Sequence, residues 1–164
     1  MSAGLAKLAT GARAADLLKD ARAQDRAGRL IAAVARYSAA IALAEDHRDP
    51  AMAAEGLRGL AEAHYKRGNA PAAIDFCRRS HDIARDIGDE RLVAEALNTM
   101  GCLHIATGQL NNARLDFLEA LRLGGLAGPI RARAQQNLGI LANIQGALDE
   151  ALAWYGRSLE EYRA

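Results

Sequence analysis

The chain has 164 residues, with 21 Lys and Arg against 20 Asp and Glu, and it is 51% hydrophobic but only 4% aromatic. A net charge of +1 supplies no global field for nucleic acid or an anionic membrane, and no apolar run is long enough to span a bilayer. We therefore expect one soluble domain over residues 1–164 with no nucleic-acid or membrane partner. The N-terminus lacks the continuous apolar core of a signal peptide, which predicts a cytoplasmic location.

Four glycines divide the chain into repeats. Gly28, Gly68 and Gly108 are spaced by 40 residues, and Gly146 follows 38 residues later. Each glycine separates two amphipathic segments in which apolar residues recur every three or four positions, as on one face of a helix. The pattern predicts helices at 12–27, 30–46, 51–67, 70–87, 90–107, 110–123, 129–145 and 148–162. These form four hairpins, in repeats of about 12–47, 51–88, 90–125 and 129–164.

Residues that begin or end helices stand at the expected boundaries. Proline is tolerated in a first turn, Asn and Asp accept hydrogen bonds at N-caps, and glycine ends helices. The chain has Pro50, Pro71 and Pro129 in first turns, Asn69 and Asp89 as N-caps, and Gly88 and the Gly124–Gly125 pair at helix ends.

Small and aromatic residues recur at fixed distances from the turn glycines. Seven residues before each glycine stand Ala21, Ala61, Gly101 and Gly139; five after it stand Ala33, Ala73, Ala113 and Ala151. Nine residues after it come Tyr37, Cys77, Phe117 and Tyr155, and twelve after it Ala40, Ser80, Ala120 and Ser158. Alanine without exception in the second helix predicts a tight crossing between the two helices of each hairpin.

This pattern of small residue, turn glycine, alanine and aromatic residue resembles the tetratricopeptide repeat. Segments such as LNTMGCLHIATGQLNNARLDFLEAL and QQNLGILANIQGALDEALAWYGRSL carry the resemblance, which covers about residues 14–164. The 40-residue period is similar to the long-helix variety of kinesin light chains, LGN-type adaptors and bacterial regulators, and ARDIGDERLVAEALNTMG is similar to the bacterial group. The resemblance implies an all-α, right-handed superhelical solenoid.

The resemblance also implies a concave groove lined by the first helix of each hairpin. It therefore implies a non-catalytic scaffold that binds a peptide or protein surface in this groove, in a bacterial regulatory or assembly pathway. The predicted partner-binding residues are Arg22, Arg26, Arg58, Tyr65, Asn98, Cys102, Ile105, Arg133, Gln136, Asn137 and Ile140. The arginines make one end of the groove basic. At the other end, amides can form hydrogen bonds with the backbone of an extended peptide, and isoleucines can cover its apolar side chains. Polar residues on a solvated helix face also need no binding role, so that alternative stays open.

Relatives that clamp the C-terminal carboxylate of chaperones use a Lys and an Asn on one first helix, an Asn on the next, and a Lys and an Arg on the third. One frame places Leu18, Arg22, Gly59, Glu95 and Thr99 at these positions, and the next places Arg58, Glu62, Thr99, Arg133 and Asn137. Neither frame matches, which disfavours a chaperone-tail receptor.

Catalytic and metal motifs are missing from the sequence, which predicts no enzyme, no cofactor and no metal. His64 and His104 occupy equivalent places in adjacent repeats, and with Cys102 they could form a metal site. The family has Tyr at that place, so histidine as an aromatic substitute is favoured. Cys77 and Cys102 are expected to be reduced packing thiols.

The last predicted helix carries an apolar cluster of Trp154, Tyr155, Leu159 and Tyr162. An exposed cluster of this kind favours an interface. The alternative function is therefore self-association, as a homodimer through this helix, or the chain is the repeat part of a longer protein. Equally open is that Trp154 and Tyr155 pack back onto the third repeat.

Overall fold

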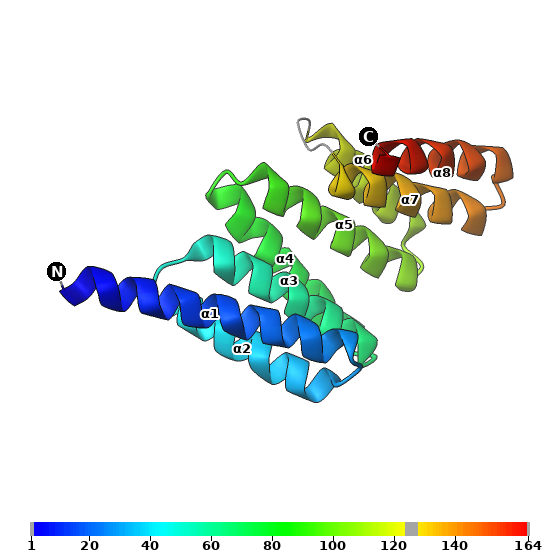
Figure 1. Ribbon diagram of the computed structural model, residues 1–164. Helices are drawn as coiled ribbons and strands as arrows, with labels where there is room; N and C mark the ends of the chain where they lie inside the picture. The colour runs from blue at the N-terminus through cyan, green and yellow to red at the C-terminus, as the bar shows by residue number, and fades with distance from the viewer. Residues whose placement is uncertain (1, 124–127, 164) are drawn as a thin grey trace. The chain divides into compact units, whose positions relative to one another are not determined.

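The computed structural model describes residues 2–123 and 128–163, with the backbone alone for residues 2–11. Over these residues it contains eight α-helices and no strand (Figure 1), which confirms the all-α prediction. The helices are α1 Ser2–Arg26, α2 Leu30–Asp46, α3 Pro50–Lys66, α4 Ala70–Asp86, α5 Glu90–Ala106, α6 Leu110–Arg122, α7 Pro129–Ile144 and α8 Leu148–Arg163.

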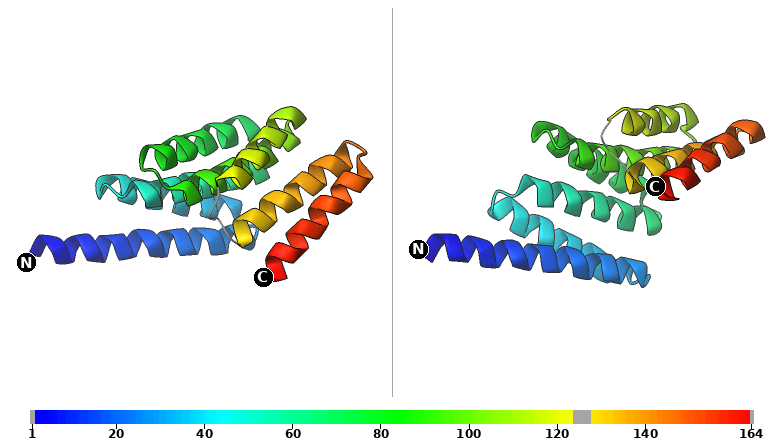
Figure 2. Two further views of the ribbon diagram at one scale, coloured as in Figure 1. Left: turned by 90° about the horizontal axis from the view of Figure 1, so that it is seen from above. Right: turned by 45° about the horizontal axis from the view of Figure 1, so that its top comes forward.

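The helices belong to two compact units, Met1–Leu92 and Val93–Ala164, and the boundary falls within the first turn of α5. In the first unit α1 pairs with α2 and α3 with α4, and α2 also packs on α3 (Figures 1 and 2). In the second unit α7 pairs with α8 and packs on α6. The single-domain organisation expected from the sequence stays a prediction.

The turns between helices share one backbone conformation. Gly28, Gly68, Gly108 and Gly146 all have positive φ values, between 73° and 79°. Glycine adopts this left-handed conformation without steric cost, and it closes the end of a helix. At Gly28, for example, the chain turns through the bonds Gly28 N–H to Asp25 O and Arg29 N–H to Gln24 O, of 3.0 and 2.9 Å.

The predicted helix boundaries are largely confirmed. Asn69 Oδ1 accepts from the Ala72 N–H at 3.2 Å, and Asp89 Oδ1 accepts from the Leu92 N–H at 3.0 Å. All three prolines lie in first turns, and Gly88 ends its helix with a φ of 69°. The Gly124–Gly125 pair lies outside the described residues.

The predicted start of the first helix at residue 12 was wrong, because α1 begins at Ser2. The added segment is rich in Ala and Leu, which favour helix, and contains no proline. Its two glycines weaken a helix by about 1 kcal/mol each without ending it.

Small residues sit where the helices of a hairpin cross, as predicted. The alanines five residues after the turn glycines are all buried. A Cβ atom on Gly101 would lie 2.4 Å from Phe117 Cε1, and one on Gly139 would lie 2.6 Å from Tyr155 Cε1. The aromatic ring of the second helix thus rests on the bare backbone of the first.

Each unit has its own apolar core. The core of the first unit is built from Leu18, Ala21, Ala33, Tyr37, Ala40, Ile41, Leu57, Leu60 and Ala63. The second unit has one cluster of Ala113, Phe117, Leu138 and Leu141, and another of Ala94, Ala120 and Ala134. Because these cores use one face of each first helix, the polar face of the same helix is left for other contacts.

Candidate functional site

In the first unit, a clamp of two arginines holds Glu55. Arg22 from α1 donates to Glu55 Oε2 at 2.7 Å, and Arg91 from the start of α5 donates to Oε1 at 3.2 Å. Burial of Glu55 opposes its ionisation, but the hydrogen bonds from both arginines outweigh burial and lower its pKa below 4.5. Glu55 is therefore a fixed negative charge on α3.

A second acidic group lies deeper on the same face. Asp25 is only 9% exposed, and its Oδ2 pairs with Lys66 Nζ. Its Oδ1 is buried without a hydrogen-bond partner among the described residues. Beside it, burial and the charges of Asp25 and Glu62 raise the pKa of Tyr37 to about 12, so the phenol remains protonated.

These groups surround a depression of about 220 Å³ between α1 and α3. Its lining consists of Arg22, Asp25, Arg26, Tyr37, Glu55, Arg58, Gly59 and Glu62. Arg58 pairs with Glu62 at 2.9 Å, and Tyr65 lies exposed near the end of α3. The basic character expected from the arginines is therefore offset, because acidic residues alternate with them along the depression.

In the second unit, two asparagines join neighbouring first helices. Asn137 Nδ2 on α7 donates to Asn98 Oδ1 on α5 at 2.9 Å, and it lies 3.5 Å from Cys102 Sγ. An amide has two N–H donors and a carbonyl acceptor. The bond between the two amides does not use the NH₂ group of Asn98, a residue that is only 9% exposed, or the carbonyl of Asn137, which is half-buried.

The other predicted residues of this face differ in exposure. Arg133, Gln136 and Ile140 are exposed, whereas Ile105 is half-buried against the cluster around Phe117. Cys77 and Cys102 are both reduced, as expected. Cys77 is buried, but the packing role predicted for Cys102 was wrong, because Cys102 is exposed beside Asn137.

The histidines lie in separate surroundings. The His64 ring packs against Phe76 at an interplanar angle of 40°, with centroids 5.1 Å apart, in the role of an aromatic residue. Burial lowers the pKa of His64. His104 Nδ1 lies 2.6 Å from Asp116 Oδ2. Within the described ranges no group of three or more His, Cys, Asp or Glu is placed to hold a metal ion.

No helix in the part of the chain that the structure describes combines the length and apolar character needed to cross a bilayer.

On α8, the four residues predicted for self-association separate into two groups. Trp154 packs on the cluster around Phe117, donates from Nε1 to Glu150 at 3.1 Å, and is covered by the Arg157 guanidinium. Tyr155, Leu159 and Tyr162 remain more exposed. Sequence reasoning missed two further exposed residues of this helix, Leu148 and Leu152, although their spacing continues the same row.

Two family models, both described as tetratricopeptide repeat, match residues 51–124 and 98–164. The chain belongs to the tetratricopeptide repeat family. The resemblance predicted from the turn glycines and the small residues is thereby confirmed. Membership of this family supports a general role for the chain as a protein-interaction scaffold.

Two crystal structures are similar to this tetratricopeptide repeat chain. BtubC (BKLC) from P. vanneervenii has a TM-score of 0.73 and 19% sequence identity, over 90% of this chain and 62% of that chain. MamA has a TM-score of 0.63 and 21% identity, over 92% of this chain and 78% of that chain. At these identities the likeness shows the fold alone. Among curated proteins no sequence matches.

Proposed function

We propose that the chain is a non-catalytic scaffold that binds an extended peptide segment on the polar face of its first helices. The amide pair of Asn98 and Asn137 carries this proposal. The NH₂ of Asn98 and the carbonyl of Asn137 take no part in the bond between the two amides, and a peptide backbone pairs with such groups through its own C=O and N–H.

The residues around the amide pair also suit the binding of an extended peptide. Gln136 and Ile140 are exposed on the same helix as Asn137, at positions one before and three after it. Residues three or four apart share a helix face, so Ile140 supplies apolar surface beside the amide. A peptide would thus bond to the amides through its backbone and cover Ile140 with a side chain.

The first unit supports a complementary preference for charged side chains. The depression between α1 and α3 has an exposed cation in its lining, Arg26. A segment with an acidic side chain fits this group. The cytoplasmic location, the bacterial regulatory or assembly pathway and the absence of catalysis stay predictions from the sequence.

The test is to select binders from a displayed library of unstructured peptides, with the full chain as the target. The affinity of each selected peptide for the full chain is then measured by titration calorimetry. We expect the double variant Asn98→Ala/Asn137→Ala to weaken binding roughly tenfold or more, because two backbone hydrogen bonds of about 1 kcal/mol each are lost.

The matched control is Asn111→Ala/Asn112→Ala, which removes two exposed asparagines from the second helix α6 of the same unit. This control should bind selected peptides like the unchanged protein. Selection of no peptide, or equal binding by both double variants, would contradict the proposal.

A further inference from the structure

The outer face of α8 carries a continuous row of exposed apolar side chains. Leucines and tyrosines stand at spacings of four, three, four and three, which keeps them on one side of a helix. Their exposed fractions are 62% for Leu148, 69% for Leu152, 36% for Tyr155, 50% for Leu159 and 53% for Tyr162. We call these five residues the α8 row.

The equivalent row of an earlier second helix is covered. On α2, Tyr37 and Ile41 correspond to Tyr155 and Leu159, and they are only 3% and 7% exposed. The first helix of the next hairpin covers them, since a Cβ on Gly59 would meet the Tyr37 ring and one on Gly56 would meet Ile41. The α8 row thus has the composition of a surface that packs on another helix.

The outer face of α1 does not fit the α8 row. The positions of α1 that correspond to Gly56 and Gly59, forty residues earlier, are Asp16 and Lys19, and both are exposed. If two chains stacked head to tail, these two charged side chains would be buried against Tyr155 and Leu159 without an oppositely charged partner. Burial of an unpaired charge makes the free energy of such an association less favourable. A symmetric contact of α8 with another α8 avoids that cost.

The order of side chains along α8 suits such a contact. We propose that two copies of the chain pair through antiparallel α8 helices, with Tyr155 at the twofold axis. In this arrangement Leu152 of each copy meets Leu159 of the other, and Leu148 meets Tyr162. The row is therefore complementary to itself.

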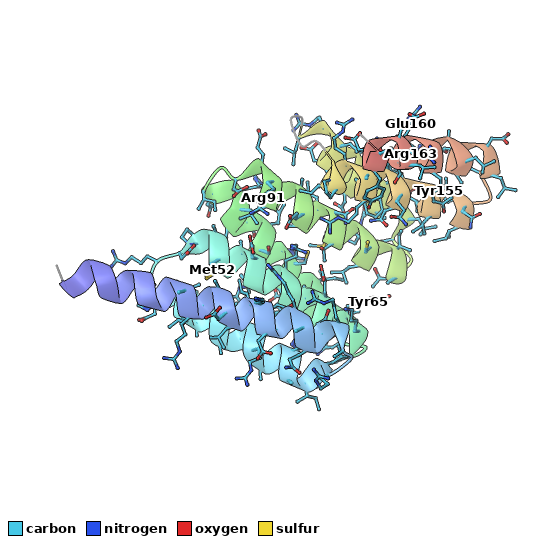
Figure 3. All side chains as sticks on the ribbon, in the orientation of Figure 1. Met52, Tyr65, Arg91, Tyr155, Glu160 and Arg163 are labelled. Atoms are coloured by element: carbon cyan, nitrogen blue, oxygen red, sulfur yellow. The ribbon has the colours of Figure 1, made fainter. Side chains whose placement is uncertain are left out.

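Charges beside the row are complementary in the same arrangement. Asp149 and Arg163 flank the row on the same side, near opposite ends of α8, and neither forms an ion pair within the part of the chain that the structure describes. Antiparallel pairing places Asp149 of one copy beside Arg163 of the other, twice per dimer. Figure 3 labels Tyr155 and Arg163 on this helix.

A glycine near the centre of α8 would allow the α8 helices of two copies to approach each other closely. Gly156 is exposed, and a Cβ on it would meet nothing within 4 Å in the chain. Each of Gly59, Gly101 and Gly139, in contrast, lies under an aromatic ring. Because glycine inside a helix is unfavourable, Gly156 needs a reason that the single chain does not provide. A crossing helix backbone next to Tyr155 provides one.

The test is sedimentation equilibrium of the full chain over a wide range of concentrations. We expect a monomer–dimer equilibrium whose Kd rises roughly 100-fold or more in Leu152→Glu, because each dimer loses two buried leucines. The matched control is Leu115→Glu, which changes a leucine of similar exposure, 66%, on α6. The control should leave the Kd unchanged.

Two further variants test the geometry without removing apolar surface. Gly156→Ala should raise the Kd roughly tenfold through a clash at the crossing, while the monomer unfolds at higher urea. Asp149→Arg should weaken pairing, and Asp149→Arg/Arg163→Asp should restore it.

A monomer at every concentration would overturn the proposal, as would a dimer that Leu152→Glu leaves intact or that Leu115→Glu disrupts equally. Loss of pairing in Leu152→Glu without rescue by the charge exchange would overturn the antiparallel arrangement.

Discussion

Glycines inside the first helices mark the places where a neighbouring ring lies against the backbone. A Cβ on Gly59 would lie 2.3 Å from Tyr37 Cε1, closer than any van der Waals contact allows. The ring belongs to α2 and the glycine to α3, so this contact sets the distance between two hairpins. The spacing of small residues predicted close packing, but it could not tell which ring each glycine meets.

We therefore expect Gly59→Ala to destabilise the protein by about 1–3 kcal/mol, because the added methyl group forces the ring or the helix to move. Urea unfolding followed by circular dichroism measures this loss. In a Tyr37→Val background the ring is gone, and the same glycine substitution should cost much less. An equal cost in both backgrounds would show that the ring is not the cause.

Ion pairs and hydrogen bonds between side chains were the part of the candidate site that the sequence did not reveal. Arg22 and Glu55 are 33 residues apart, and Asn98 and Asn137 are 39 apart, so each pair meets only because first helices stack side by side. The 40-residue period places these residues on neighbouring first helices, but the choice of partner depends on side-chain conformation. The sequence thus pointed to the arginines as site residues, but it did not predict which acids would bind them.

At the level of helices, the clamp on Glu55 connects three of them, since Arg22 lies in α1, Glu55 in α3 and Arg91 in α5. The two hydrogen bonds need an ionised carboxylate. The folded protein therefore holds the proton of Glu55 less tightly than the unfolded chain does, and the clamp contributes stability only while the carboxylate is charged.

This contribution is present above the ordinary pKa of Glu55, 4.5, and is lost as the pH falls through the lowered pKa of the folded state. We expect the free energy of unfolding to fall as the pH drops below the ordinary pKa of 4.5, with a shallower fall in Glu55→Gln. Urea unfolding at each pH measures both slopes. Arg22→Met should also flatten the slope, and an unchanged slope in Glu55→Gln would contradict the assignment.

Helix positions were predicted well, because the residues that begin and end a helix act within their own segment of sequence. Prolines, caps and turn glycines act on their own segment of chain, so Asn69 and Asp89 could be recognised without knowledge of the fold. The start of α1 was missed because Ala-rich sequence supports helix without any marked cap. Exposure along α8 was only partly predicted, because the burial of Trp154 depends on α6 and α7.

On the scale of the whole molecule, the two units have separate cores. Leu57 and Tyr37 belong to the first, and Phe117 and Leu138 to the second. In repeat proteins each hairpin contacts only its neighbours, so a defect in one core is transmitted weakly to distant helices.

Phe117→Ala should therefore destabilise the second unit by about 3–5 kcal/mol and leave most of the first unit protected. Hydrogen exchange measured by mass spectrometry should show faster exchange in α6 and α7 with little change in α1 and α2. Leu57→Ala is the reciprocal variant and should affect α1 and α3. Uniform acceleration along the whole chain in either variant would show that the units unfold together.

The left-handed turn residues follow a shorter period than the repeat itself. Among the described residues they are Gly28, Arg48, Gly68, Gly88, Gly108, Gly128 and Gly146, at intervals of 20 residues and a final interval of 18. Each interval contains one helix, and within each unit the paired helices run in opposite directions. An insertion or deletion of two intervals inside a unit would leave the later helices of that unit pointing as before. A change of one interval would reverse those helices, so each unit can gain or lose length only in pairs of helices.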